Sequence, residues 1–483
     1  MHARYRWSAS MALPALLALA STPVGAAVNI DSLNPAITAS DVSALAVQPD
    51  GRIVIGGYFT SASPAHNYLA RLNADGSFDT TFNPYVNGRV DAVAVQGDGK
   101  LIIAGALTSV NGAARSYVAR LKADGTLDTA FVDPHVVATM SWSPPAASHT
   151  VAWPIDAIAV QADGRIVLGG VFYKVGGAAH ANIVRLNADG SVDAGFNAGA
   201  DGNSVQAVTV QPDGKVLAGG FFTQVHAGTD AMPRQNVARF NGDGTLDRAF
   251  DAGTGLNAVS ALTLQADGKI LAGIDSAPAY IPPSAYDWDG PRIARLNSDG
   301  TPDPYPSFDY SGRRALVQSI ALQTDGNMYV AGLDVPVNGF EGSPRLINEF
   351  SRQYADGSND VSLYFSDATV SYGAAYVHDE PRGLALQPDG RILLAGLFLN
   401  VADTTRNQIA RFVNDGVATQ YLYADSHSSI RWNRSGASPE LARATFELST
   451  DGITYTNSGC WTDVPSQFVT VDAMSGVTLR EYR

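Results

Sequence analysis

The stretch "VQPDGRIVIGGYFT", residues 47–60, joins two apolar runs through an Asp-Gly pair. An Asp-Gly pair between apolar, β-branched runs is a strong signal for a β-hairpin. In the type I′ turn that this pair favours, both corner residues have positive φ, which Asp and Gly tolerate. We therefore predict that Asp50 and Gly51 form a hairpin corner, in preference to a metal ligand or a catalytic acid.

The same stretch returns along the whole chain. The pattern Q-x-D-G occurs seven times, and each copy is followed by a second pattern of Arg, three residues and Asp-Gly. The glutamines are Gln48, Gln96, Gln161, Gln211, Gln265, Gln323 and Gln387, and the arginines are Arg71, Arg120, Arg185, Arg239, Arg295, Arg352 and Arg411. Such self-similarity predicts a repeat architecture, and we number the copies unit 1 to unit 7.

Each unit has the pattern of four β-strands. In unit 1 these are residues 42–48, 52–59, 67–73 and 77–82, and the first two are nearly continuous apolar runs. Strands of that kind are covered on both faces. The sequence therefore predicts an all-β fold, a seven-bladed β-propeller with four-stranded antiparallel blades over residues 27–424.

These repeats resemble the delta-60 repeat family of bacterial secreted β-propellers. The stretches that carry the resemblance are "VQPDGRIVIGGYFT", "VQADGRIVLGGVFYKVGG" and "VQPDGKVLAGGFFTQV", each followed by text like "RLNADGSFD". The resemblance covers residues 42–416. It implies a propeller that is secreted or surface-associated, and it implies no biochemical activity.

The first 26 residues have the pattern of a secretory signal peptide. His2, Arg4 and Arg6 precede the apolar stretch 11–20, and "VGA" supplies small residues for cleavage. We therefore predict a signal peptide at residues 1–26 and an exported protein, in the periplasm, on the cell surface or in the medium. No segment is apolar and long enough to be a transmembrane helix.

The two ends of the mature chain are predicted to have structural roles. The stretch "NIDSLNP" (29–35) is similar to "SFDTTFNP" (77–84), whereas unit 7 lacks the aspartate of its own fourth strand. We therefore expect residues 27–35 to add the outer strand of the last blade. Residues 430–483 break the repeat and predict a small C-terminal β module docked on the propeller.

Charge and cysteine content limit the partners. The formal net charge is −14, and removal of the signal peptide leaves 30 basic and 46 acidic residues. Nucleic acids and anionic membranes both need positive charge, so neither is an expected partner. Cys460 is the only cysteine, so no internal disulfide forms.

The second Asp-Gly pattern has some resemblance to calcium-binding loops. "NADGSFD" (73–79) spaces oxygen ligands as such loops do. The candidates are Asn73, Asp75, Asp79, Asn187, Asp189 and Asp193. The first ligand position of those loops is acidic, but here all seven copies carry arginine, and a guanidinium beside a cation is electrostatically poor. We therefore predict no cofactor, with calcium as the weaker alternative, and expect Arg71 to pair with Asp79 and the repeated glutamines to bond a neighbouring turn.

Three insertions interrupt the repeat pattern, at residues 132–154, 274–292 and 361–381. Strand alternation puts them all on the face opposite the Asp-Gly turns. They hold aromatic and acidic candidates for ligand binding: Trp142, Trp153, Tyr280, Tyr286, Asp287, Trp288, Asp289, Tyr376 and His378. Aromatic and acidic residues on long loops over a rigid scaffold are typical of a binding site for a glycan or a protein. The alternative is that these aromatic residues pack on one another and order their own loops.

The sequence favours a binding or surface-scaffold protein over an enzyme. It contains no HExxH, GxSxG, Walker or GxGxxG motif, and its eight histidines have no ligand-like spacing. Propeller enzymes assemble their sites from distant residues, so a hydrolase or lyase acting on polysaccharide is the second hypothesis. A purely structural envelope protein is the third. The oligomeric state cannot be read from the sequence.

Overall fold

The computed structural model describes residues 29–35, 37–61, 66–138, 154–227, 230–275, 293–303, 313–336, 347–355, 359–366, 380–401 and 404–413, and six strands after residue 418. All regular elements in these ranges are β-strands. Within the described residues, no helix is long and apolar enough to cross a membrane.

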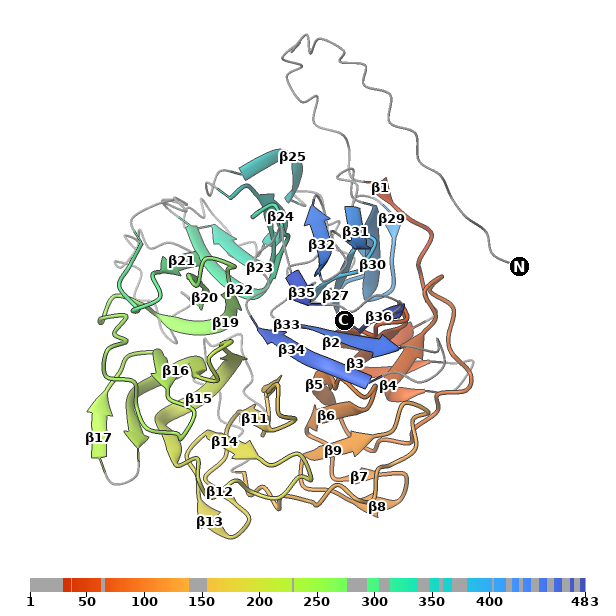
Figure 1. Ribbon diagram of the computed structural model, residues 1–483. Helices are drawn as coiled ribbons and strands as arrows, with labels where there is room; N and C mark the ends of the chain where they lie inside the picture. Colours follow the sequence, from red (N-terminus) through yellow and green to blue (C-terminus); the bar gives the residue numbers. More distant parts are fainter. Residues whose placement is uncertain are drawn as a thin grey trace, which may run out of the picture.

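The first strands of the units form a closed circle (Figure 1). These inner strands are β2 (Ile37–Val47), β5 (Val90–Val95), β10 (Ala157–Val160), β15 (Ala198–Val210), β19 (Ala258–Leu264), β22 (Arg313–Leu322) and β26 (Glu380–Leu386). Each inner strand lies beside the next, and β26 lies beside β2. The described part of the chain is thus a ring of antiparallel sheets around a central axis.

Each inner strand pairs with a second strand of its own unit, and the second strand pairs with a third. The second strands are β3 (Ile53–Ser61), β6 (Leu101–Gly105), β11 (Ile166–Gly169), β16 (Val216–Ala227), β20 (Ile270–Asp275), β23 (Met328–Pro336) and β27 (Ile392–Leu397). The third strands are β4 (Asn67–Leu72), β9 (Val118–Leu121), β14 (Ile183–Leu186), β18 (Val237–Phe240), β21 (Ile293–Leu296), β24 (Ile347–Gln353) and β30 (Ile409–Val413). All these pairings are antiparallel.

The outer edge of each sheet is short. In units 1 to 5 it is an isolated bridge such as Leu72↔Phe78, and in unit 6 it is β25 (Asn359–Ser366), which pairs with β24. The prediction that residues 361–366 belong to an inserted loop is therefore wrong. The apolar residues of "NDVSLYFS" alternate, and alternation is the pattern of a strand.

Further short strands pair outside the inner, second and third strands. These are β7 (Ser109–Val110) with β8 (Ala113–Ala114), β12 (Lys174–Val175) with β13 (Ala178–Ala179), β17 (Asp230–Pro233) with β16, and β28 (Asn400–Val401) with β29 (Thr404–Thr405).

The hairpin corner is confirmed, but its turn type differs from the prediction. The Gly51 amide donates to the Gln48 carbonyl at 2.9 Å, and Gly51 has φ of 82°, whereas Asp50 is not among the residues with positive φ. Pro49 suits the first corner of a type I turn, and the glycine then takes the left-handed position that follows it. The Asp50 carboxylate accepts the Arg52 amide at 3.1 Å, so it stabilises the turn.

Apolar cores fill the spaces between neighbouring sheets. All five residues of β6 are buried, as expected for a strand that is covered on both faces. One cluster joins Val54 and Leu69 of unit 1 to Phe82, Leu101 and Ile103, which pack on unit 2. Each sheet therefore depends on its two neighbours for burial.

The repeated arginine links each unit to the next. The Arg71 guanidinium lies 2.8 Å from the Asp79 carboxylate, which confirms the expected pairing, and it donates to the Ala123 carbonyl of unit 2 at 2.5 Å. It also contacts the Gln48 side-chain oxygen at 3.4 Å and lies over the ring of Phe82. The Arg71 side chain is 3% exposed, so this charge is held almost wholly inside the protein.

The N-terminus completes the ring. β1 (Asn29–Ile30) pairs antiparallel with β30, so the sheet of unit 7 has the order β1-β30-β27-β26. Asp31 then takes the place of the aspartate that unit 7 lacks, because its carboxylate accepts the Arg411 guanidinium at 2.5 Å. Arg411 in turn donates to the Ala74 carbonyl of unit 1 at 2.5 Å.

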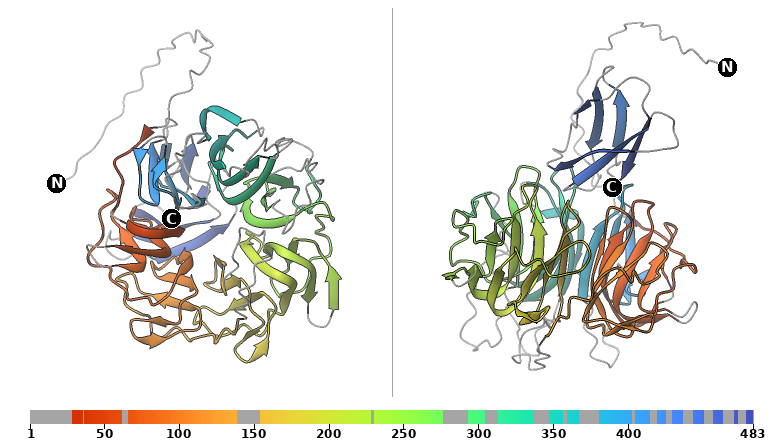
Figure 2. Two further views of the ribbon diagram at one scale, coloured as in Figure 1. Left: turned by 180° about the vertical axis from the view of Figure 1, so that it is seen from behind. Right: turned by 60° about the horizontal axis from the view of Figure 1, so that its bottom comes forward.

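The strands after residue 418 form two small sheets. These are β31 (Thr419–Ala424), β32 (Ser429–Ser435) and β35 (Thr470–Asp472), and β34 (Thr456–Thr462), β33 (Arg443–Ser449) and β36 (Thr478–Tyr482). Figure 2 shows them on one side of the ring. The predicted limits of the signal peptide, the propeller and the C-terminal module stay predictions.

Candidate functional site

The ring has two faces that differ in how they are built. Both kinds of Asp-Gly turn lie at one face, which we call the turn face. Because the strands alternate in direction, the ends of the second strands and the starts of the inner strands lie at the other, which we call the connection face. The third strand β30 runs towards the turn face, so the chain leaves the ring for the C-terminal sheets on that side.

The predicted ligand-binding side chains fall outside the described residues. This holds for Trp142, Trp153, Tyr280, Tyr286, Asp287, Trp288, Asp289, Tyr376 and His378. The described strands that flank their segments, such as β20 and β26, end or begin at the connection face.

Exposed apolar side chains gather on the connection face. Among the described residues nine large apolar side chains are exposed, and four of them lie at or directly after the ends of second strands, at this face: Tyr58, Tyr173, Phe221 and Leu399. Tyr354 and Val413 belong to the turn face, and the Val132 amide donates to the Asp189 carbonyl of a second Asp-Gly turn. Tyr58 and Phe221, each directly after the Gly-Gly of a second strand, are both 51% exposed. Aromatic side chains presented in this way suit stacking on a ligand.

Charged pairs cover the turn face instead. The aspartate of the first turn pairs with the basic residue two positions later, as Asp98 does with Lys100 at 2.8 Å and Asp163 with Arg165 at 3.3 Å. The opposite charges of each pair neutralise one another within the turn, so few charged groups of these turns are available to bind a partner.

The calcium candidates of unit 1 have other partners. Asp75 accepts hydrogen bonds from the amide and hydroxyl of Ser77, at 2.9 and 2.7 Å, and these bonds lower its pKa. Burial of the Asp79 carboxyl opposes ionisation, but hydrogen bonds from Thr81 and Arg71 outweigh it and lower the pKa. The Asn73 amide donates to the Ser77 hydroxyl at 3.0 Å.

Unit 3 repeats this arrangement at its own candidates. Asn187 and Asp189 bond Ser191, and Asp193 lies 2.8 Å from the Arg185 guanidinium. No group of three potential metal-ligating side chains occurs in the described part of the chain. These residues act as turn caps and as arginine partners.

A ring of polar residues surrounds the axis at the connection face. Five positions before each repeated glutamine, within an otherwise apolar strand, stand Ser43, Asp91, Asp156, Gln206, Ser260, Gln318 and Arg382. Each is half-buried, and the residue before each is buried. In six units the strand register shifts at this position, as in a β-bulge. Bulges re-aim side chains and occur often beside functional sites.

Charged residues join units 7, 1 and 2 within this ring. Asp41 accepts the Arg89 guanidinium at 2.7 Å and the Arg382 guanidinium at 2.8 Å. Arg89 also pairs with Asp91. We call these four residues the axial cluster. Its two carboxylates are 6% exposed, so it lies beneath the surface of the connection face.

Asp91 is the unusual member of the axial cluster. Its second oxygen, Oδ2, accepts no hydrogen bond within the described structure. It lies over Gly105, where a Cβ atom would come within 2.8 Å of it. Burial raises the pKa of Asp91 to about 6, against the opposing effect of Arg89. The carboxyl therefore changes charge just below neutral pH, which is unusual for an aspartate.

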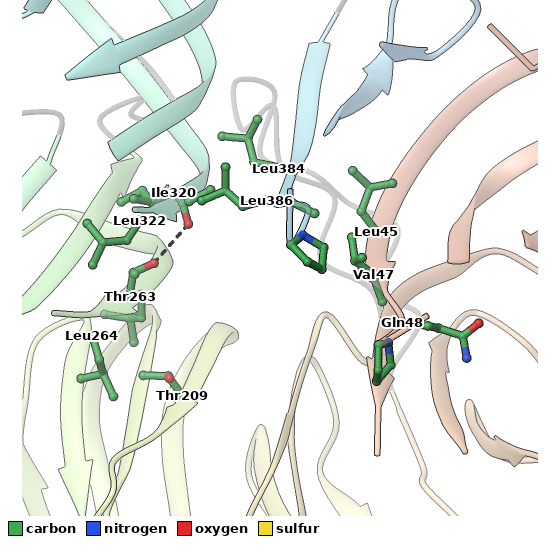
Figure 3. A pocket seen from close by; sticks show the side chains of 16 residues that line it. Leu45, Val47, Gln48, Thr209, Thr263, Leu264, Ile320, Leu322, Leu384 and Leu386 are labelled. Atoms are coloured by element: carbon green, nitrogen blue, oxygen red, sulfur yellow. Dashed lines mark hydrogen bonds between the residues drawn. The ribbon is translucent and has the colours of Figure 1, made fainter. Parts of the chain in front are cut away.

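The axis also contains an apolar cavity of about 460 Å³ (Figure 3). Its walls are inner-strand residues such as Leu45, Leu262, Ile320 and Leu384, and it reaches Gln48 beside the first turn. No ionisable side chain occurs among the described residues that line it. It lies on the turn-face side of the polar ring.

The sequence carried a signal for the polar ring. A polar residue at the same place in all seven apolar strands points to a position that each unit uses. The axial cluster had no comparable signal, because Asp41 and Arg382 are 341 positions apart and meet only when the ring closes.

A ring of small antiparallel sheets around one axis is the architecture of a β-propeller scaffold. Six stretches match a family model described as "Domain of unknown function (DUF5122) beta-propeller", at residues 48–82, 96–131, 161–196, 211–250, 289–304 and 387–418. Repeats of this β-propeller domain therefore run along the chain. A search of the curated proteins found no match.

Two solved structures have weak similarity to the chain. One is MPT-4, a mannose phosphorylase from Leishmania mexicana in complex with phosphate ion, at 12% identity and a TM-score of 0.29, over 58% of this chain and 87% of that one. The other is the C-terminal domain of PilY1 from Pseudomonas aeruginosa, at 11% identity and a TM-score of 0.21, over 82% of this chain and 92% of that one. At these TM-scores neither similarity bears on the function of this chain.

Proposed function

We propose that this chain is an exported, seven-bladed propeller of delta-60-type repeats that acts as a binding or surface-scaffold protein. It holds a glycan or protein ligand on the connection face. The closed circle of inner strands supports the blade count, because seven such strands contact one another in order. Export rests on the predicted signal peptide at residues 1–26.

Four exposed apolar side chains at the connection face carry the proposal. A soluble protein tolerates such side chains singly, but several on one face mark an interaction surface. Tyr58, Tyr173, Phe221 and Leu399, each 51% exposed, lie there around a ring of hydrogen-bonding groups. Aromatic rings with polar groups nearby suit a sugar ring or a peptide. The described residues that flank 139–153, 276–292 and 367–379, the remaining parts of the predicted insertions, lie at the same face.

Binding assays on the full mature chain test this proposal. A glycan array and a pull-down from a surface extract identify a ligand, and the variants Tyr58→Ala, Tyr173→Ala and Phe221→Ala are then compared with the wild type. Each removes a side chain that is 51% exposed on the connection face, so each is expected to weaken binding about tenfold or more. The triple variant Trp142→Ala, Trp153→Ala, Trp288→Ala extends the test to the inserted segments.

Tyr354→Ala is the matched control. Tyr354 is 40% exposed but lies on the turn face, so its loss is expected to leave binding unchanged. A ligand that is lost with Tyr354 and kept by the connection-face variants would overturn the proposal.

A further inference from the structure

The bulge position has a structural task that serine fulfils and an ionised aspartate cannot. In unit 1 the Ser43 hydroxyl donates to the Val90 carbonyl of unit 2 at 3.4 Å. In unit 5 the Ser260 hydroxyl donates in the same way to the Val317 carbonyl of unit 6. In these two units the position bonds one unit to the next through a donor. A carboxylate is only an acceptor, and it becomes a donor when it is protonated.

Asp91 occupies this position in unit 2, and the equivalent carbonyl of unit 3 belongs to Ile155. Its Oδ1 atom is taken by Arg89, and its Oδ2 atom is buried without a partner in the described structure. A buried acceptor without a partner is costly, and one proton on that oxygen removes the cost.

We propose that Asp91 is a proton-binding switch: in mildly acidic surroundings it takes up one proton, bonds unit 2 to unit 3 as the serines do, and adds one positive charge to the axial cluster. The proton comes from solvent and goes to Oδ2, and no other bond changes. The ionised state, in which Arg89 is shared between Asp41 and Asp91, is the neutral-pH form.

The charged surroundings of Asp91 fit such a switch. Asp41 comes from β2, Arg89 directly precedes β5, and Arg382 comes from β26, whereas β6 offers only Gly105. Asp156 holds the equivalent position on the side of unit 3. The two arginines and two aspartates of the axial cluster sum to zero when Asp91 is ionised, and to one positive charge when it is protonated. If a ligand binds at the connection face as proposed above, this change in charge regulates that site.

The test uses the full mature chain without ligand, so it does not depend on the proposed function. Because the pKa of folded Asp91 is raised to about 6, its protonation stabilises the fold at low pH, and this contribution is lost as the pH rises through about 6. As the pH falls from about 7.5 to about 5, the Tm of the wild type is expected to rise by about 1–1.5 °C relative to Asp91→Ser, which carries the residue of units 1 and 5.

Two measurements keep the result interpretable. Asp98→Ser, at an exposed turn, is expected to keep the pH dependence of the wild type. NMR of the labelled aspartate carboxyl groups is expected to show one group that titrates near pH 6 and is missing in Asp91→Asn, which covers the case in which Asp91→Ser does not fold. Equal pH slopes in the wild type and Asp91→Ser, or an Asp91 carboxyl that titrates near pH 4, would overturn the switch. A failed glycan array would leave it standing.

Discussion

The same repeated unit builds two faces with opposite chemistry. At the turn face the repeat is strict, and its aspartates are satisfied by arginine, lysine and backbone amides within the scaffold. At the connection face the equivalent positions differ from unit to unit, and exposed aromatic residues stand beside a polar ring. Strict repetition therefore marks the residues that hold the ring together, and variation among the units marks the positions that are available for a task.

The largest expected effect tests whether the turn face is structural. Asp193 lies 2.8 Å from two nitrogen atoms of Arg185, whose side chain is 4% exposed. Asp193→Ala leaves a buried guanidinium without its carboxylate, which is expected to cost about 3–5 kcal/mol in the free energy of unfolding. Chemical denaturation measures this cost, and ligand binding by the folded fraction should be unchanged.

Asp163→Ala is the control for that experiment. Its carboxylate pairs with Arg165 on the same face, but the side chains are 52% and 43% exposed. Solvent screens such a pair, so the expected cost is about 0.5 kcal/mol or less. A cost close to that of Asp193→Ala would mean that burial does not separate the two classes of turn-face pair.

A second prediction contrasts the pH response of the two faces. The pKa of Asp193 is lowered, since hydrogen bonds from Gly195 and Arg185 outweigh its burial. A lowered pKa stabilises the fold above about pH 3.9, and this stability is lost as the pH falls below that value. Asp91 acts in the opposite direction at higher pH. Stability measured along a pH series should therefore be highest near about pH 4, set by carboxyl groups of opposite faces.

The variants Asp193→Asn and Asp91→Asn separate the two limbs of that profile. Asp193→Asn should reduce the loss of stability on the acid side, and Asp91→Asn should reduce it on the neutral side. The contrast between the faces is wrong if Asp193→Asn changes the stability on the neutral side or if Asp91→Asn changes it on the acid side.

The repeat made most of the scaffold predictable from the sequence. The pairing of Arg71 with Asp79 could be anticipated because both residues recur at a fixed spacing. The similarity of "NIDSLNP" to a fourth strand pointed to the same segment that pairs with β30, where Asp31 meets Arg411. In both cases a local pattern decides a contact because it appears many times.

The connection face was less predictable, because its contacts arise between single residues of different units. Arg89 meets Asp41 at 2.7 Å only because the inner strands converge on the axis, and neither residue recurs in the other units. The orphan oxygen of Asp91 depends on a bulge and on Gly105, which a strand pattern does not reveal. The turn type was misjudged for a related reason, since an Asp-Gly pair fits two hairpin geometries, and units 2 and 3 form the same turn with Gly97 and Ala162 in the place of Pro49.

The smallest expected effect compares two glycines within one turn of unit 2. Gly99 has φ of 80°, whereas Gly97 is not among the residues with positive φ and has nothing within 4 Å of the place where a Cβ atom would lie. Gly99→Ala forces an alanine into the left-handed region and is expected to cost about 1–2 kcal/mol. Gly97→Ala introduces the residue that units 3 and 5 already carry there, and by restricting the unfolded chain it should stabilise the fold by about 0.4–1 kcal/mol. Thermal unfolding of the two variants under one condition measures both. If both variants change the free energy of unfolding in the same direction, the left-handed conformation of the glycine is not the reason that the Asp-Gly pair recurs at the turn face.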